Sequence, residues 1–139
     1  MLVASKNENF LDQNIDWEFP IPIAYGPGRL SEIGLFCEQF QISNPLIITD
    51  EGSKNLPFIN RLITLLQKAS IPSKLFFGVS PNPRDDEIMA GCETYRSGKH
   101  DSIIAIGGGS AMDGAKAIGM TVNSGVNLWD FEYRKPSPK

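Results

Sequence analysis

The residues most able to do chemistry are three consecutive glycines that lie between an apolar run and a segment with helical spacing. Residues 103–106 are all apolar and predict a buried strand, which Gly107, Gly108 and Gly109 follow directly. Ser110 then opens the helical segment. Glycines let a ligand approach the backbone with no Cβ atom in the way, and the first turn of a helix offers unpaired N–H groups and a positive dipole end. This arrangement predicts a phosphate or pyrophosphate site.

The glycine loop, residues 107–109, matches neither of two common nucleotide-binding motifs. A GxGxxG fingerprint that starts at Gly107 needs a third glycine where this chain has Met112. A P-loop needs lysine directly after its last glycine, but Gly114 is followed by Ala115. A purely structural tight turn is the alternative to a phosphate site, although three successive glycines lose much backbone entropy on folding.

Ser110 and Asp113 follow the glycine loop at a spacing that has two interpretations. In the first, they form a helix-capping box in which Asp replaces the more usual Glu or Gln, and Asp113 pairs with Lys116 on the helix surface. In the second, the hydroxyl and N–H groups of Ser110 donate to a bound phosphate. Asp113 then orients the loop or touches the nicotinamide side of the ligand.

Asp50 closes a second apolar run, residues 46–49. A carboxylate at the end of such a strand can accept hydrogen bonds from both hydroxyls of an adenosine ribose and would repel a 2′-phosphate. Asp50 therefore favours NAD over NADP, with NADP remaining possible. A turn or helix-capping role for Asp50 is the alternative, and Glu51 competes for contact with the ribose.

The elements that must position these residues alternate along the chain. Apolar runs predict strands, and helical spacing of apolar residues predicts the segments between them. The strands are nearly continuous in apolar character, which indicates that both faces of their sheet are covered. We therefore predict an α/β fold, a Rossmann-like doubly wound parallel sheet with helices on both faces. The expected strands are 46–49, 74–79 and 102–106, and the expected helices are 29–41, 58–69, 84–97 and 110–122.

Three polar or glycine-rich segments follow the expected strands and should meet at one edge of the sheet. They are Asp50, the loop Pro81-Asn82-Pro83 and residues 107–110. Ligands of open α/β sheets bind in the crevice beyond the carboxyl ends of the strands, so these segments are expected to share a crevice.

The two ends of the chain lack the periodicity of the segment between them. Residues 1–16 are expected to form a flexible arm, followed by one domain over 17–139. An edge strand or short hairpin is expected over 17–25, where prolines interrupt an extended segment. Residues 123–139 are expected to form a loop that leads away from the domain.

Composition limits the classes of partner. The 139 residues suit one domain, and the net charge of −3 gives no reason to expect nucleic acid or an anionic membrane as partner. No apolar run is long enough to span a bilayer and no secretory signal is evident, so a cytoplasmic protein is expected. Cys37 and Cys92 are expected to be reduced core residues on helices, and His100, the only histidine, a surface or loop residue. No histidine-based metal site is expected.

The segment Gly107-Gly-Gly-Ser-Ala-Met-Asp113 resembles the GGGSxxD motif of iron-containing (group III) alcohol dehydrogenases. Tyr25-Gly-Pro-Gly28, the segment from Ile48 to Gly52, and Pro81-Asn82-Pro83 resemble that family's N-terminal domain in order and spacing. The resemblance implies the dehydroquinate synthase-like N-terminal architecture. It also implies an NAD(P)-dependent oxidoreductase that transfers hydride between an alcohol or aldehyde and a nicotinamide.

The resemblance further implies a role for each matched residue. Asp50 would hold the adenosine ribose, Gly107 would shape the turn, and Asn82 and Asp113 would line the cofactor cleft. The pyrophosphate would be bound by Gly108, Gly109 and Ser110. No catalytic residue and no metal ligand falls on this chain, because the family's divalent metal, iron or zinc, is held by a mostly helical C-terminal domain.

That helical domain has no counterpart among these residues, so the resemblance implies a truncated chain, about the first third of such an enzyme. We expect it to be inactive in alcohol oxidation by itself. An apolar face that another domain would cover makes a homo-oligomer plausible. Two alternatives stay open: a nucleotide-binding or interaction module without catalysis, and a relative of glycerol dehydrogenase or dehydroquinate synthase.

Overall fold

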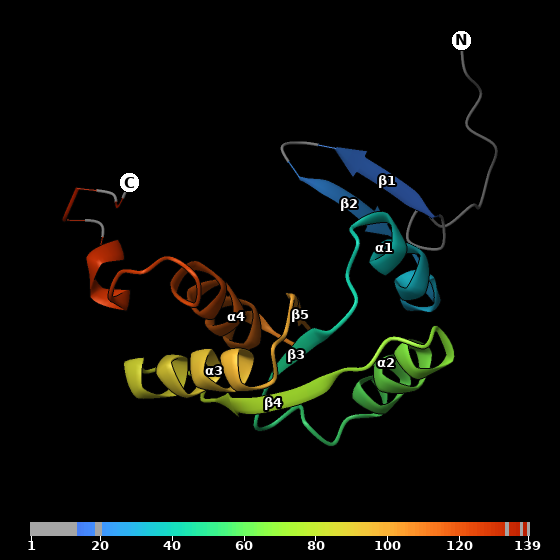
Figure 1. Ribbon diagram of the computed structural model, residues 1–139. Helices are drawn as coiled ribbons and strands as arrows, with labels where there is room; N and C mark the ends of the chain where they lie inside the picture. The colour runs from blue at the N-terminus through green and yellow to red at the C-terminus, as the bar shows by residue number, and fades with distance from the viewer. Residues whose placement is uncertain (1–13, 19–20, 133, 137, 139) are drawn as a thin grey trace, which may run out of the picture.

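The computed structural model describes residues 14–18, 21–132, 134–136 and 138, and it has the expected alternation of strands and helices (Figure 1). The strands are β1 (Ile15–Glu18), β2 (Pro22–Tyr25), β3 (Pro45–Asp50), β4 (Lys74–Val79) and β5 (Ser102–Ala105). The α-helices are α1 (Ile33–Gln39), α2 (Pro57–Lys68), α3 (Asp85–Ser97) and α4 (Gly109–Thr121). Among the described residues there are also two short 3-10 helices, η2 (Arg29–Glu32) and η3 (Leu128–Phe131). The helix expected over 29–41 is thus η2 followed by α1.

The central sheet is parallel, as predicted, and β3 is its middle strand. The strand order is β4-β3-β5. Ile47 of β3 lies opposite Leu75 of β4 and Ile104 of β5. The register with β4 shifts between Ile48 and Asp50, at the carboxyl end of β3. Because all three strands run the same way, the segments that follow them emerge at one edge of the sheet.

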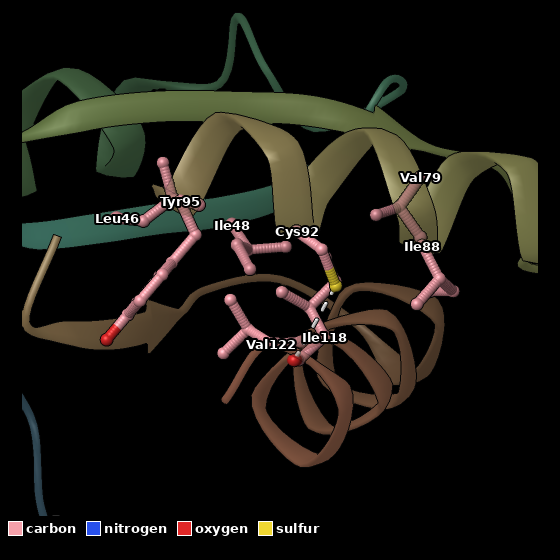
Figure 2. Close-up of a cluster of buried hydrophobic side chains, with 9 residues drawn as sticks. Leu46, Ile48, Val79, Ile88, Cys92, Tyr95, Ile118 and Val122 are labelled. Carbon is pink, nitrogen blue, oxygen red and sulfur yellow. Dashed lines mark hydrogen bonds between the residues drawn. The ribbon is translucent and has the colours of Figure 1, made fainter. Parts of the chain in front are cut away.

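Helices cover both faces of this sheet, because the side chains of β3 alternate between two apolar clusters. On one face, Ile48 packs with Cys92 of α3 and Ile118 of α4, and Figure 2 shows these side chains pointing toward one another. On the other face, Ile47 packs with Cys37 of α1 and with Leu62 and Leu66 of α2. This confirms the doubly wound α/β architecture.

The two cysteines confirm their prediction as core residues. Cys37 and Cys92 are fully buried, lie on α1 and α3, and are free thiols. Burial raises the pKa of both thiols, which keeps them protonated and unreactive.

The chain begins its ordered pairing earlier than expected. β1 starts at Ile15, so Ile15 and Asp16 belong to a hairpin with β2 and not to a flexible arm over 1–16. A salt bridge of 2.6 Å between Asp16 and Arg29, together with the pairing of Ile15 with Tyr25, accounts for the difference. Residues 1–13 of the expected arm lie outside the described residues.

The first part of the stretch after α4, residues 123–132, does not lead away as expected, because local polar contacts form η3 within it. The Asn127 side chain accepts a hydrogen bond of 3.0 Å from the N–H of Trp129, and the Asp130 carboxylate accepts one of 3.0 Å from the N–H of Asn127. The Trp129 indole then donates to Asp85 at the start of α3, at 3.3 Å. No helix within the described ranges is both long and apolar enough to cross a membrane.

His100 lies in the loop between α3 and β5, as one form of its prediction had it, but the expectation of a surface position is wrong. The residue is only 8% exposed. Lys99 has a left-handed backbone, with φ of 51°, and this turn brings the imidazole back against the end of α3. There the ring lies 6.1 Å from that of Tyr95, and its Nδ1 is 3.0 Å from the carbonyl oxygen of Asn44.

Candidate functional site

The glycine loop makes the turn from β5 into α4. The fold requires glycine at position 107, whether or not a ligand is bound. Its φ of +141° is a conformation that residues with a Cβ rarely adopt. A Cβ placed there would lie 3.0 Å from the Cβ of Ala111 and 3.1 Å from Oδ2 of Asp50. Gly107 therefore shapes the turn and brings the loop against the end of β3.

Gly108 and Gly109 have no such internal reason to be glycine. A Cβ on either residue would meet no atom within 4 Å, and the φ of Gly108, −85°, suits any residue. Gly108 is the N-cap of α4, and no side chain caps that helix. The first turn of α4 thus has no side-chain cap, and glycine at these two positions leaves room for a ligand.

Ser110 does not form the capping box that was one interpretation of its spacing with Asp113. Because α4 begins at Gly109, Ser110 lies inside the helix rather than at its N-cap. Its hydroxyl instead donates a hydrogen bond of 2.9 Å to the carbonyl oxygen of Pro81. No ion pair joins Asp113 to Lys116, both of which the structure describes. The capping interpretation is therefore wrong.

Asp50 ends β3 beside the glycine loop and has a role in its own turn. Its Oδ1 accepts a hydrogen bond of 2.9 Å from the N–H of Ser53. Its Oδ2 is the oxygen that would lie 3.1 Å from a Cβ on Gly107. One carboxylate oxygen thus serves the turn, as the alternative interpretation held, and the other faces the glycine loop.

Asn82 lies in the exposed loop between β4 and α3, which Glu87 holds in shape. The Oε2 atom of Glu87 accepts hydrogen bonds from the N–H of Arg84 at 3.0 Å and from the N–H of Ser80 at 3.2 Å. These bonds, with that from the Ser80 hydroxyl, lower the pKa of Glu87 and keep it ionised. Sequence reasoning missed Glu87, although a glutamate as the third residue of a helix is a known capping signal.

Asp113 faces a pocket on the α3 side of α4. This pocket, of about 430 Å³, lies between α3, α4 and η3. Its lining is mostly apolar and includes Ile88, Ala117, Met120 and Trp129. Asp113 therefore stands one turn beyond the glycine loop, in the wall of a pocket that η3 also lines.

The sequence-predicted site residues fall into two connected groups. Asp50 lies against Gly107, and Ser110 is hydrogen-bonded to the loop that carries Asn82, so these segments share the carboxyl edge of the sheet. Asp113 lies on the next turn of α4 and lines the neighbouring pocket. Within the described part of the chain, no three His, Cys, Asp or Glu side chains are grouped closely enough to hold a metal ion.

Known proteins have sequences similar to this one. Alcohol dehydrogenase 4 of Schizosaccharomyces pombe is 34% identical over 115 residues, which are 83% of this chain and 27% of that protein. 1,3-Propanediol dehydrogenase of Citrobacter freundii is 30% identical over 118 residues, which are 84% of this chain and 30% of that protein. The chain thus spans less than a third of the length of these relatives.

Solved structures agree with the sequence comparison. NADH-dependent butanol dehydrogenase A from Thermotoga maritima superposes with a TM-score of 0.74 at 25% identity, over 82% of this chain and 29% of that one. Sulfoacetaldehyde reductase from Bifidobacterium kashiwanohense, solved with NAD⁺, gives a TM-score of 0.68 at 28% identity, over 76% of this chain and 28% of that one. The family model for iron-containing alcohol dehydrogenases matches residues 20–139. This chain belongs to the iron-containing alcohol dehydrogenase family.

Proposed function

We propose that this chain binds a nicotinamide dinucleotide at the carboxyl edge of its sheet, as the cofactor domain of an oxidoreductase. The reaction is hydride transfer between an alcohol or aldehyde and the nicotinamide. The observation that supports this most is the pair Gly108 and Gly109, which lie at the uncapped start of α4 with open space where their Cβ atoms would be. A pyrophosphate suits such a cradle of backbone N–H groups.

Each site residue has a proposed role. The N–H groups of Gly108, Gly109 and Ser110 bind the pyrophosphate, and Oδ2 of Asp50 accepts from the adenosine ribose. The Ser110 hydroxyl already donates its single hydrogen to Pro81, so its N–H is the group available to the anion. Asn82 and Asp113 line the cleft on either side of that helix start.

NAD is the proposed cofactor, and NADP is the alternative. The Asp50 carboxylate would repel the 2′-phosphate of NADP. Two relatives support this choice by name: NADH-dependent butanol dehydrogenase A from Clostridium acetobutylicum, 32% identical, and NAD-dependent methanol dehydrogenase from Bacillus methanolicus, 27% identical.

The described residues do not fit the divalent metal for which the family is named, since they contain no cluster of metal-ligating side chains. No step of the proposed function is therefore assigned to a metal held by this chain. Dinucleotide binding is proposed for this chain itself. Hydride transfer between an alcohol or aldehyde and the nicotinamide is proposed for a whole protein of the family.

Self-association remains a prediction. Ile21 and Phe40 are 69% and 58% exposed, and with Phe36 they line a groove of about 490 Å³ between the β1–β2 hairpin and α1. Light scattering of the purified chain tests this directly.

Calorimetric titration with NAD⁺ and NADP⁺ tests the proposed site. The Gly109→Val variant fills the open space at the start of α4 and is expected to abolish NAD⁺ binding without unfolding the chain. Gly119→Val, the same change at an exposed position near the other end of α4, is the matched control and should bind NAD⁺ normally. Unchanged binding by Gly109→Val would place the ligand elsewhere, and no binding by the wild-type chain would overturn the proposal.

A further inference from the structure

Thr49, the residue before Asp50, carries a hydroxyl group with no hydrogen-bond partner. Its side chain is fully buried at the carboxyl end of β3. Among the buried side-chain polar atoms of the described residues, only Oγ1 of Thr49 and Nε2 of His100 lack a partner. A buried hydroxyl that makes no hydrogen bond costs the fold the desolvation of that group, and most such groups in proteins are satisfied.

The position of this hydroxyl ties it to the glycine loop. A Cβ placed on Gly107 would lie 3.3 Å from Oγ1 of Thr49 and 3.1 Å from Oδ2 of Asp50. The unpaired hydroxyl is therefore packed directly beneath the turn that precedes the uncapped start of α4. It lies beside Gly107, which directly precedes the residues proposed to bind the pyrophosphate, and the same Cβ position is close to Oδ2 of Asp50.

Packing gives no reason for a threonine here. Valine has the same branched shape, suits a buried strand and carries no polar atom. The other buried threonine, Thr121, differs in this respect, because its hydroxyl donates to the carbonyl oxygen of Ala117 at 2.8 Å. Thr49 alone of the two has an unmet hydrogen bond, and it is the one beside the proposed site.

We propose that Thr49 is a positioning residue of the dinucleotide site, whose hydroxyl gains its hydrogen bond only when the ligand occupies the glycine loop. This inference rests on the proposed function. In the free chain, the unsatisfied hydroxyl lowers the stability of the fold. Ligand binding removes this cost, so part of the binding free energy comes from satisfying the Thr49 hydroxyl. The residue acts through the loop and touches no reacting atom.

The test uses Thr49→Val, which removes the hydroxyl and keeps the shape, with Thr121→Val as the matched control. In the free chain, Thr49→Val is expected to raise the melting temperature by about 3 °C, because it removes an unsatisfied polar group. In calorimetric titration the same variant is expected to bind NAD⁺ about fivefold more weakly, the value of one neutral hydrogen bond. Thr121→Val should lower or leave unchanged the melting temperature and bind NAD⁺ like the wild type.

Thr49→Ser keeps the hydroxyl and loses only a methyl group, so it should bind NAD⁺ within about twofold of the wild type even though the core loses packing. Equal NAD⁺ affinity of Thr49→Val and the wild type would overturn the inference while leaving the proposed function intact. A loss of binding by Thr49→Ser as large as that of Thr49→Val would also overturn it. Failure of the wild-type chain to bind NAD⁺ would instead reject the proposed function, and the inference with it.

Discussion

The Ser110 hydroxyl donates a hydrogen bond to the carbonyl oxygen of Pro81, at 2.9 Å, and so joins two loops that are 29 residues apart in the chain. One loop follows β5 and the other follows β4, and these strands flank β3 on opposite sides. The bond therefore connects the segments that follow the two flanking strands, past the end of the central strand. It sets the spacing of the glycine loop and the Asn82 loop before any ligand arrives.

Ser110→Ala should separate these two loops while leaving the helix backbone intact. Loss of one hydrogen bond is expected to lower the free energy of unfolding by about 1 kcal/mol and to weaken NAD⁺ binding about fivefold, because the N–H of residue 110 remains. Urea denaturation and calorimetry measure the two effects. In η2, the Ser31 hydroxyl donates a similar hydrogen bond of 2.9 Å to the carbonyl oxygen of Gly28. Ser31→Ala removes that bond and should leave NAD⁺ binding unchanged. A hundredfold loss of affinity in Ser110→Ala would mean that the hydroxyl contacts the ligand directly.

Asp50→Gly should weaken NAD⁺ binding and relax discrimination against NADP⁺. The ratio of the two affinities is expected to fall about tenfold, because the variant removes both the ribose acceptor and the charge that repels a 2′-phosphate. Asp50→Asn is the control for the turn, since its side-chain oxygen can still accept from the N–H of Ser53. Calorimetric titration of both variants with both cofactors gives the ratio, and an unchanged ratio in Asp50→Gly would contradict the assignment.

Gly107 and Gly108 should respond differently to alanine. Gly107→Ala is expected to lower the free energy of unfolding by about 1–3 kcal/mol, because its positive φ and the nearby Cβ of Ala111 leave no place for a methyl group. Gly108→Ala meets no neighbouring atom and should change stability little, yet it should weaken NAD⁺ binding. Urea denaturation measures the stability of each variant, and calorimetric titration measures its affinity for NAD⁺. Equal loss of stability in both variants would count against the open cradle.

Asp101 should make the stability of the chain fall in acid. Burial alone would raise its pKa, but hydrogen bonds from Ser43, Ser102 and Asn44 lower it from 3.8 to about 2. A folded pKa below the unfolded value contributes stability that is complete above about pH 4 and is lost as the pH falls toward 2. The difference in melting temperature between the wild type and Asp101→Asn should therefore be constant near neutrality and shrink over that range. A difference that stays the same at low pH would contradict this cause.

Local sequence patterns predict the sheet and its helices because the residues that become buried are apolar and regularly spaced in the sequence. The apolar run that ends at Asp50 is fully buried up to Thr49, and the helical spacing of Leu62 and Leu66 marks the face of α2 that packs on Ile47. The glycine loop is predicted for a similar reason, since a strand, three glycines and a helix are consecutive. The contact of Asp50 with that loop follows once the strands are known to be parallel.

Contacts between segments that are distant in the chain produce no comparable pattern in the sequence. The burial of His100 depends on a left-handed turn at Lys99, and the Ser110 bond depends on where the loop after β4 lies. The fold of η3 rests on polar caps instead of apolar periodicity. Thr49 looks like an ordinary strand residue in the sequence, and only its surroundings identify the missing partner.

Trp129 gives the chain an intrinsic fluorescent reporter. Trp129 is 58% exposed, its indole donates a hydrogen bond to Asp85, and it lines the same pocket as Asp113. The chain has only one other tryptophan, Trp17, in the β1–β2 hairpin. Because reduced nicotinamide absorbs light at the wavelengths that indole emits, bound NADH should quench Trp129 by energy transfer, and Trp129→Phe should remove most of that signal. Occupancy of the crevice can thus be followed optically, without a label, in the unmodified chain.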